Sequence, residues 1–256
     1  MKVTLAYMKK ELTEQIRSGR LALLGIIFLA IGIMNPAVAK LTPMLMEMLS
    51  DSLAESGMTV TEITVTAKGS IVQLYKNMPL ALIAFALMEG GIFTREYESG
   101  TMALTLCRGI SRHKVLLSKL SMLLLLWGTG YWLSFLVTYG YTAYYWDLSA
   151  VPKLWVSALL YFLFGIFAVS LAVFFSSFMS SGAGVLGAGF GTVVAMYLVG
   201  IIPKVGKYLP TKLIDGSLSL TADTPFSDYI PALVITLSLC AVLCTVSFAL
   251  FSKRSL

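Results

Sequence analysis

The chain has 256 residues, 57% of them hydrophobic and 12% charged, with a mean hydropathy of +0.84 and a net charge of +6. A soluble domain carries about 25% charged residues and avoids large exposed apolar patches, so this composition excludes a soluble enzyme or binding domain. The same composition excludes an intrinsically disordered chain, which needs low hydrophobicity. The excess of basic residues indicates the orientation of the chain in a membrane rather than binding to nucleic acid.

Six stretches are apolar and long enough to cross a bilayer, which needs about 20 residues in a helix. They are continuously apolar, whereas the strands of a membrane barrel alternate. We therefore predict an all-α polytopic membrane protein with one transmembrane domain over residues 1–256. The predicted spans are Leu21–Ala39, Ile71–Phe93, Val115–Thr142, Leu154–Ser177, Ala183–Ile202 and Ile230–Phe251.

The segment before the first span, residues 1–20, has the pattern of an amphipathic helix. Its apolar positions recur at spacings of three and four, at Leu5, Met8, Leu12 and Ile16. We expect this helix to lie in the headgroup layer. Ala37-Val38-Ala39 resembles a signal-peptide cleavage site, so cleavage is the alternative, but the long basic segment favours an uncleaved span.

Three loops share an excess of basic residues. Twelve of the 19 lysines and arginines lie in the N-terminal segment, in the loop after span two and in the C-terminal tail, and seven lie on the opposite side with most of the acids. The positive-inside rule then assigns both termini to the cytoplasm.

Prolines divide the predicted outer segments. Asn35-Pro36 predicts a kink or the end of the first span. A short helix is expected after Pro43, followed by an extended stretch over Thr59–Thr66. Prolines also divide residues 203–229, and this segment could enter the membrane part-way and return to the same side.

The loop between spans two and three predicts a short helix over Gly100–Cys107. Ser99 is suited to cap its start, Arg108 to lie near its C-terminus and Gly109 to end it, while Ser111 is suited to cap the next helix. Such a two-turn, partly apolar element on the cytoplasmic face is suited to docking into the groove of another protein.

This loop resembles the signature of ABC-2 type ATP-binding-cassette permeases. Members show an acidic residue, then Gly-Thr, a leucine-rich helix, Ser-Arg, and a Ser/Gly-Lys in the next span. The matching residues are Glu96 or Glu98, Gly100-Thr101, Leu104, Leu106, Ser111-Arg112 and Ser118-Lys119. The start of the chain, from Lys9-Lys10-Glu11-Leu12 to Asn35-Pro36, is also similar. One departure is Arg108-Gly109, where many members have proline.

The resemblance implies a permease without catalytic activity. The sequence contains no Gly-x-x-x-x-Gly-Lys-Ser/Thr loop, so we expect ATP and Mg to bind to a separate ABC ATPase, present in two copies with two permease copies. Homodimer and heterodimer stay open. The family implies a bacterial plasma-membrane exporter whose coupling helix contacts the ATPase. The implied coupling residues are Glu96, Glu98, Ser99, Gly100, Thr101, Leu104, Leu106, Arg108, Ser111 and Arg112.

Other residues are candidates for a pathway or an interface. Glu89 is ionisable near membrane depth, which marks a functional candidate, but we favour pairing with Arg95 or with a base of the N-terminal helix. Trp127 and Trp132 lie deeper than the aromatic belt and are candidates for lining the path of an amphipathic substrate. Small residues at spacings of four predict close helix packing, with a second copy or with another span, at Ala183, Gly187, Gly191 and Ala195.

Three alternatives remain at this stage. An ion-coupled secondary transporter or channel is disfavoured because the middles of the spans carry few ionisable residues. An intramembrane enzyme is disfavoured because His113, the single histidine, falls in a cytoplasmic loop. A chain with one histidine also cannot form a zinc site that needs several histidine ligands. An immunity or signalling permease with little transport stays open. The substrate, whether a peptide, an antibiotic, a lipid-like molecule or an ion, is not specified by the sequence.

Overall fold

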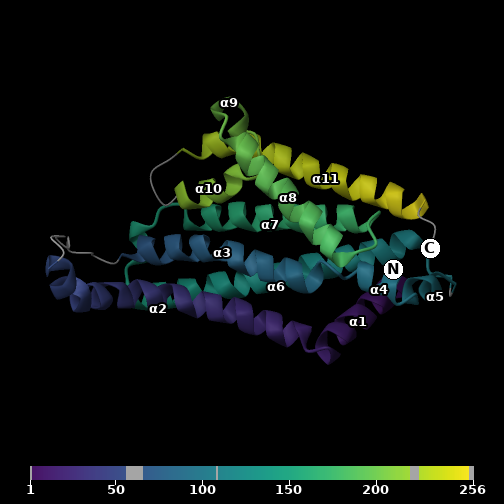
Figure 1. Ribbon diagram of the computed structural model, residues 1–256, viewed down its shortest axis with the longest axis horizontal. Helices are drawn as coiled ribbons and strands as arrows, with labels where there is room; N and C mark the ends of the chain where they lie inside the picture. The colour runs from purple at the N-terminus through teal and green to yellow at the C-terminus, as the bar shows by residue number, and fades with distance from the viewer. Residues whose placement is uncertain (1, 56–65, 108, 220–224, 254–256) are drawn as a thin grey trace.

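The computed structural model describes residues 2–55, 66–107, 109–219 and 225–253, and within them it contains helices and no strands (Figure 1). The first helices are α1 (Lys2–Arg17), α2 (Arg20–Glu55), α3 (Ala67–Glu89), α4 (Thr94–Glu98) and α5 (Thr101–Cys107). They are followed by α6 (Arg112–Tyr145), η1 (Leu148–Ala150), α7 (Leu154–Ser176), α8 (Gly182–Gly200), α9 (Pro203–Gly206), α10 (Lys212–Ser219), η2 (Phe226–Tyr229) and α11 (Ile230–Lys253).

Six of the described helices, α2, α3, α6, α7, α8 and α11, are long and apolar enough to cross a membrane, which confirms the predicted fold class. In Figure 1 both chain ends lie at one end of the bundle together with α4 and α5. We call this the terminal end, and it is the end that the positive-inside rule assigns to the cytoplasm. The other end is called the far end.

Of the two outcomes predicted at Asn35-Pro36, the end of the first span is wrong, because α2 continues through Pro36 and Pro43 to Glu55, and the kink stays a prediction. Proline removes the backbone donor that would bond the carbonyl four residues earlier. That carbonyl, of Gly32, instead accepts a hydrogen bond from the Thr138 hydroxyl of α6 at 2.8 Å. The Gly32 carbonyl thus keeps a hydrogen-bond partner on a neighbouring helix, which is needed because no water is available in the bilayer core.

Two further boundaries differ from the prediction. Helix α3 ends at Glu89 and is followed by a turn and the short α4, whereas the predicted span continued to Phe93. The helix expected after Pro43 is the end of α2 rather than a separate element. The stretch expected to be extended, Thr59–Thr66, lies outside the described residues except at its last position. Helix α10 packs on α7, with Leu213 buried, so part of the segment 203–229 folds back onto the bundle.

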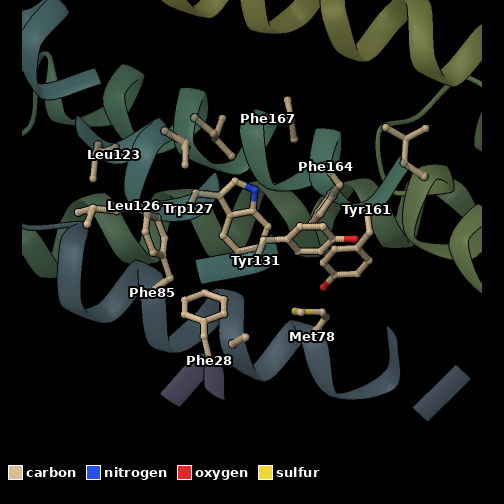
Figure 2. Packing of buried hydrophobic residues seen from close by; sticks show 14 of the residues in the cluster. Phe28, Met78, Phe85, Leu123, Leu126, Trp127, Tyr131, Tyr161, Phe164 and Phe167 are labelled. Carbon is tan, nitrogen blue, oxygen red and sulfur yellow. The ribbon is translucent and has the colours of Figure 1, made fainter. Parts of the chain in front are cut away.

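An aromatic cluster forms the centre of the bundle (Figure 2). The Trp127 ring of α6 contacts Phe28 of α2 and Phe85 of α3 edge to face, with ring centroids 6.0 and 5.7 Å apart. Its indole N–H donates to the carbonyl of Phe162 in α7 at 3.2 Å. Gly165, also in α7, lies against the same indole, where an added Cβ would overlap it. The cluster thus joins four helices through one tryptophan.

Replacing Gly165 by alanine is expected to destabilise the protein by about 1–3 kcal/mol, because the methyl group would overpack the Trp127 site. Thermal unfolding of the purified protein in detergent measures this effect. The matched control is Gly191→Ala in α8, where an added Cβ meets nothing within 4 Å. Equal melting temperatures for the two variants would contradict the close packing of α7 on Trp127.

Candidate functional site

The loop that resembles the family signature forms a compact pair of short helices at the terminal end. Helix α5 spans Thr101–Cys107, within one residue of the predicted Gly100–Cys107. Gly100 and Gly109 flank it with φ of +68° and +80°, a backbone region that favours glycine. Ser99 was expected to cap the start of α5, but it ends α4 as that helix's C-cap. Arg108 lies outside the described residues.

Helix α5 has one buried face and one exposed face. Met102 is buried in the core, and Leu106 packs against it. Leu104 is 64% exposed, which leaves a large apolar side chain at the surface of the terminal end. The other predicted coupling residues that are exposed there are Glu98, Ser99, Gly100, Thr101 and Ser111. The arrangement offers a small apolar contact surface with polar residues around it.

Arg112 connects the start of α6 to the end of α11. Its Nη1 donates to the Phe251 carbonyl at 3.2 Å. A cation near a helix C-terminus is favourable because of the helix dipole. Ser111, the residue before it, is the N-cap of α6 by its extended backbone, although its side chain makes no capping bond. Arg112 therefore joins the start of α6 to the end of α11.

Beneath α4 lies a buried network of charges. The Lys119 ammonium group of α6 is 3.2 Å from a carboxylate oxygen of Glu11 in α1 and 3.3 Å from one of Glu96 in α4. It also donates to the Ile92 carbonyl at 3.1 Å. The side chain of Lys119, a residue of the family signature, is only 1% exposed. Glu96 is buried as well and faces this network.

Two residues of α1 extend the network toward the surface. The Lys10 ammonium group lies 2.9 Å from Glu96 and 3.1 Å from Glu11. Burial lowers the pKa of Lys10, but the hydrogen bond to Glu96 and the charges of both carboxylates outweigh it, so the pKa is raised. The Tyr7 hydroxyl donates to Glu96 at 3.3 Å, and burial together with that negative charge raises the pKa of Tyr7. Lys10 stays charged and Tyr7 stays neutral near pH 7.

Three carboxylates in this region, Glu11, Glu14 and Glu96, have oxygens within 4.8 Å of one another. Such a group could ligate a cation. Here Lys10 contacts all three, and Lys119 contacts the two buried ones. The ammonium groups already supply the positive charge, so we interpret the cluster as an ion-pair network.

Glu89 is fully buried at the end of α3. The favoured pairing with Arg95 or another base is not found, because among the described residues no ion pair within 4.0 Å involves Glu89. Its partner is an amide: Gln15 of α1 donates to one oxygen at 2.6 Å. The other oxygen has no partner, and Glu89 lines a small cavity of about 50 Å³. Arg95 donates to the Met88 carbonyl instead.

The two tryptophans proposed for a pathway lie in aromatic packing. Trp127 is fully buried in the cluster described above. Trp132 is partly buried and packs against Phe135, with ring centroids 5.5 Å apart, and against Trp155, 6.4 Å apart. Neither residue lines the large apolar groove between α3, α7 and α8, which has a volume of about 610 Å³.

The small residues of α8 are all exposed on the single chain: Ala183, Gly187, Gly191 and Ala195. At Gly187 and Gly191 an added Cβ would meet nothing within 4 Å. Within the part of the chain that the structure describes, no other span covers this face. It is therefore free to approach another helix closely.

Sequence reasoning missed the inner face of α1. Tyr7, Glu11 and Gln15 are all buried against the bundle. They recur every four residues, which places them on one helical face. That spacing is a signal in the sequence, but the prediction for this helix uses only the apolar stripe beside it, which places the helix in the headgroup layer. The stripe residues Leu5 and Ile16 are strongly exposed, as expected for contact with lipid.

The family model for "ABC-2 family transporter protein" matches residues 5–256, almost the whole chain. The chain belongs to the ABC-2 transporter family. It is therefore a multi-pass membrane protein, and ABC-2 permeases are in general non-catalytic membrane subunits that associate with an ABC ATPase. The search of curated proteins found no match.

Replacing Lys119 by methionine is expected to destabilise this ABC-2 protein by about 3–5 kcal/mol, because Glu11 and Glu96 would lose the cation buried between them. Thermal unfolding in detergent measures the loss. Lys114→Met is the matched control, since Lys114 is exposed on the same helix and should change stability by less than about 0.5 kcal/mol. Similar losses in both variants would argue against the network as a structural element.

Proposed function

We propose that this chain is the membrane-spanning subunit of an ABC exporter, moved by a separate ATPase that docks on α5. The observation that carries the proposal is the exposed Leu104 on a two-turn helix at the terminal end. A large apolar side chain in the middle of a polar surface is typical of a contact that a partner buries. The chain's ABC-2 membership supplies the class of that partner.

The ion-pair network gives a route by which movement of α5 reaches the spans. Helix α5 joins α4 directly, and Glu96 of α4 is held by Lys10 of α1 and Lys119 of α6. Because the charges are buried and mutually paired, separating them is costly, and the three helices are expected to move together. ATP binding by the partner would then shift the bundle between two packings.

The proposed assembly contains two permease copies and two ATPase chains, with ATP and Mg bound by the ATPases. The exposed small-residue face of α8 suits contact with the second copy, because small residues let helix backbones approach closely. The partner copy could be identical or a related permease. Export, and a bacterial plasma membrane as the location, are expectations from the family resemblance.

Replacing Leu104 by glutamate is expected to reduce co-purification of the ATPase at least tenfold, since a charge would have to be buried without a partner. The measurement is the amount of ATPase, identified by its phosphate-binding loop, recovered with an affinity-tagged chain from its own membranes.

Leu104→Met is the matched control, because it conserves volume and apolar character and should retain the ATPase. Monodisperse elution of both variants would show that the permease itself is folded. Full recovery of the ATPase with Leu104→Glu would contradict docking on α5, as would transport by the reconstituted chain with no ATPase and no nucleotide.

A further inference from the structure

Helix α1 carries an exposed apolar stripe beside the face that it buries against the bundle, mainly on α6. In this stripe Leu5 is 71% exposed, Leu12 37% and Ile16 58%. Only Ser18 and Gly19 separate α1 from the first span, α2, and Gly19, with φ of +71°, turns the chain between the two helices (Figure 1). The stripe therefore lies at the membrane surface, where lipid chains are available to cover it.

Two exposed cations lie directly beside this stripe. Lys9 comes seven residues before Ile16, which places the two side chains about 20° apart around the helix, and Arg17 is the residue that follows Ile16. Among the described residues, neither Lys9 nor Arg17 makes an ion pair within 4.0 Å. Lys10 differs from them, because it is held by three carboxylates of the buried network. The surface of α1 thus presents two positive charges that are not used inside the protein.

A shallow hollow on α1 brings the two cations together. Its lining includes Lys9, Arg17 and the short side chain of Thr13. Glu14 also lines the hollow, but its carboxylate lies 3.2 Å from the Lys10 ammonium group, which neutralises it. Two positive charges therefore remain for an anion from outside the chain.

We propose that the exposed face of α1 binds an anionic phospholipid of the leaflet at the terminal end, with the phosphate at Lys9 and Arg17 and the acyl chains along Leu5, Leu12 and Ile16. Ammonium and guanidinium groups form charge-assisted hydrogen bonds with phosphate oxygens. Each basic residue near an anionic leaflet strengthens binding about fivefold. A zwitterionic phospholipid carries its own cation, which competes with the two side chains for the phosphate.

Lipid explains both features of this face at once. The apolar stripe needs hydrocarbon and the adjoining cations need an anion, and an anionic phospholipid offers the two in the same order from the bilayer core to its surface. An acidic protein surface, such as one on the ATPase, would have to cover the stripe as well as the cations. Because the lipid site does not depend on docking of the ATPase, it is tested with the full chain alone.

The chain is purified in detergent and titrated with dioleoylphosphatidylglycerol or dioleoylphosphatidylcholine, and bound lipid is measured by native mass spectrometry. The wild type is expected to bind phosphatidylglycerol more tightly. The double variant Lys9→Gln/Arg17→Gln should weaken that binding about 25-fold, fivefold for each cation, and leave binding of phosphatidylcholine unchanged. Its thermal unfolding temperature without added lipid should equal that of the wild type, because both side chains are exposed.

The matched control is Lys204→Gln/Lys207→Gln, which removes the same charge from exposed positions in the segment 203–229 and should keep wild-type affinity for phosphatidylglycerol. Equal affinity of the wild type and the α1 variant would overturn the proposal. Equal loss in both double variants would also overturn it, because the effect would then come from net charge. Displacement of bound phosphatidylglycerol by an equal concentration of inorganic phosphate would identify a simple anion site and overturn lipid as the occupant.

A protein occupant has its own signature. If the α1 variant kept its affinity for phosphatidylglycerol but lost co-purification of the ATPase from its own membranes, the cations would belong to a contact between proteins, and the lipid site would be wrong. If it lost the lipid and retained the ATPase, the proposal would be supported independently of docking on α5.

Discussion

The buried ammonium group of Lys119 holds the terminal end of this protein together. It lies among two carboxylates and a backbone carbonyl that come from α1, from α4 and from the turn between α3 and α4. A charge in such a place is stable only when its partners are fixed around it. The position of the interfacial helix α1 on the bundle therefore depends on this network, as does the position of α4, which carries α5.

The same need to satisfy polar groups shapes the membrane-embedded part. Thr138 bonds the carbonyl that Pro36 leaves free, and Ser70 bonds Thr142 at 2.8 Å between α3 and α6. Among apolar helices in lipid, packing and such hydrogen bonds replace the hydrophobic force that holds soluble bundles together. The aromatic cluster around Trp127 adds shape complementarity, because Gly165 allows α7 to lie directly on the indole.

Helix α8 behaves differently from the other spans. It is the least buried of the six, and it packs mainly on α7. It carries exposed small residues, and one of them, Gly187, also lines the apolar groove between α3, α7 and α8. Its exposed small residues leave room for the backbone of another helix to approach closely.

The sequence by itself determined the membrane fold, because long apolar runs and the distribution of basic residues follow from the bilayer as solvent. It also located α5 to within one residue, since glycines and a short apolar pattern bound that helix. Only the tertiary structure decided the rest. The continuity of α2 depends on Thr138, which lies about a hundred positions away in the chain. The burial of Lys119 depends on Glu11 and Glu96, and the amide partner of Glu89 comes from α1. Such pairings join segments that are far apart in the sequence, so the residue types alone do not specify which partner each one has. Three-dimensional contact decides the partner.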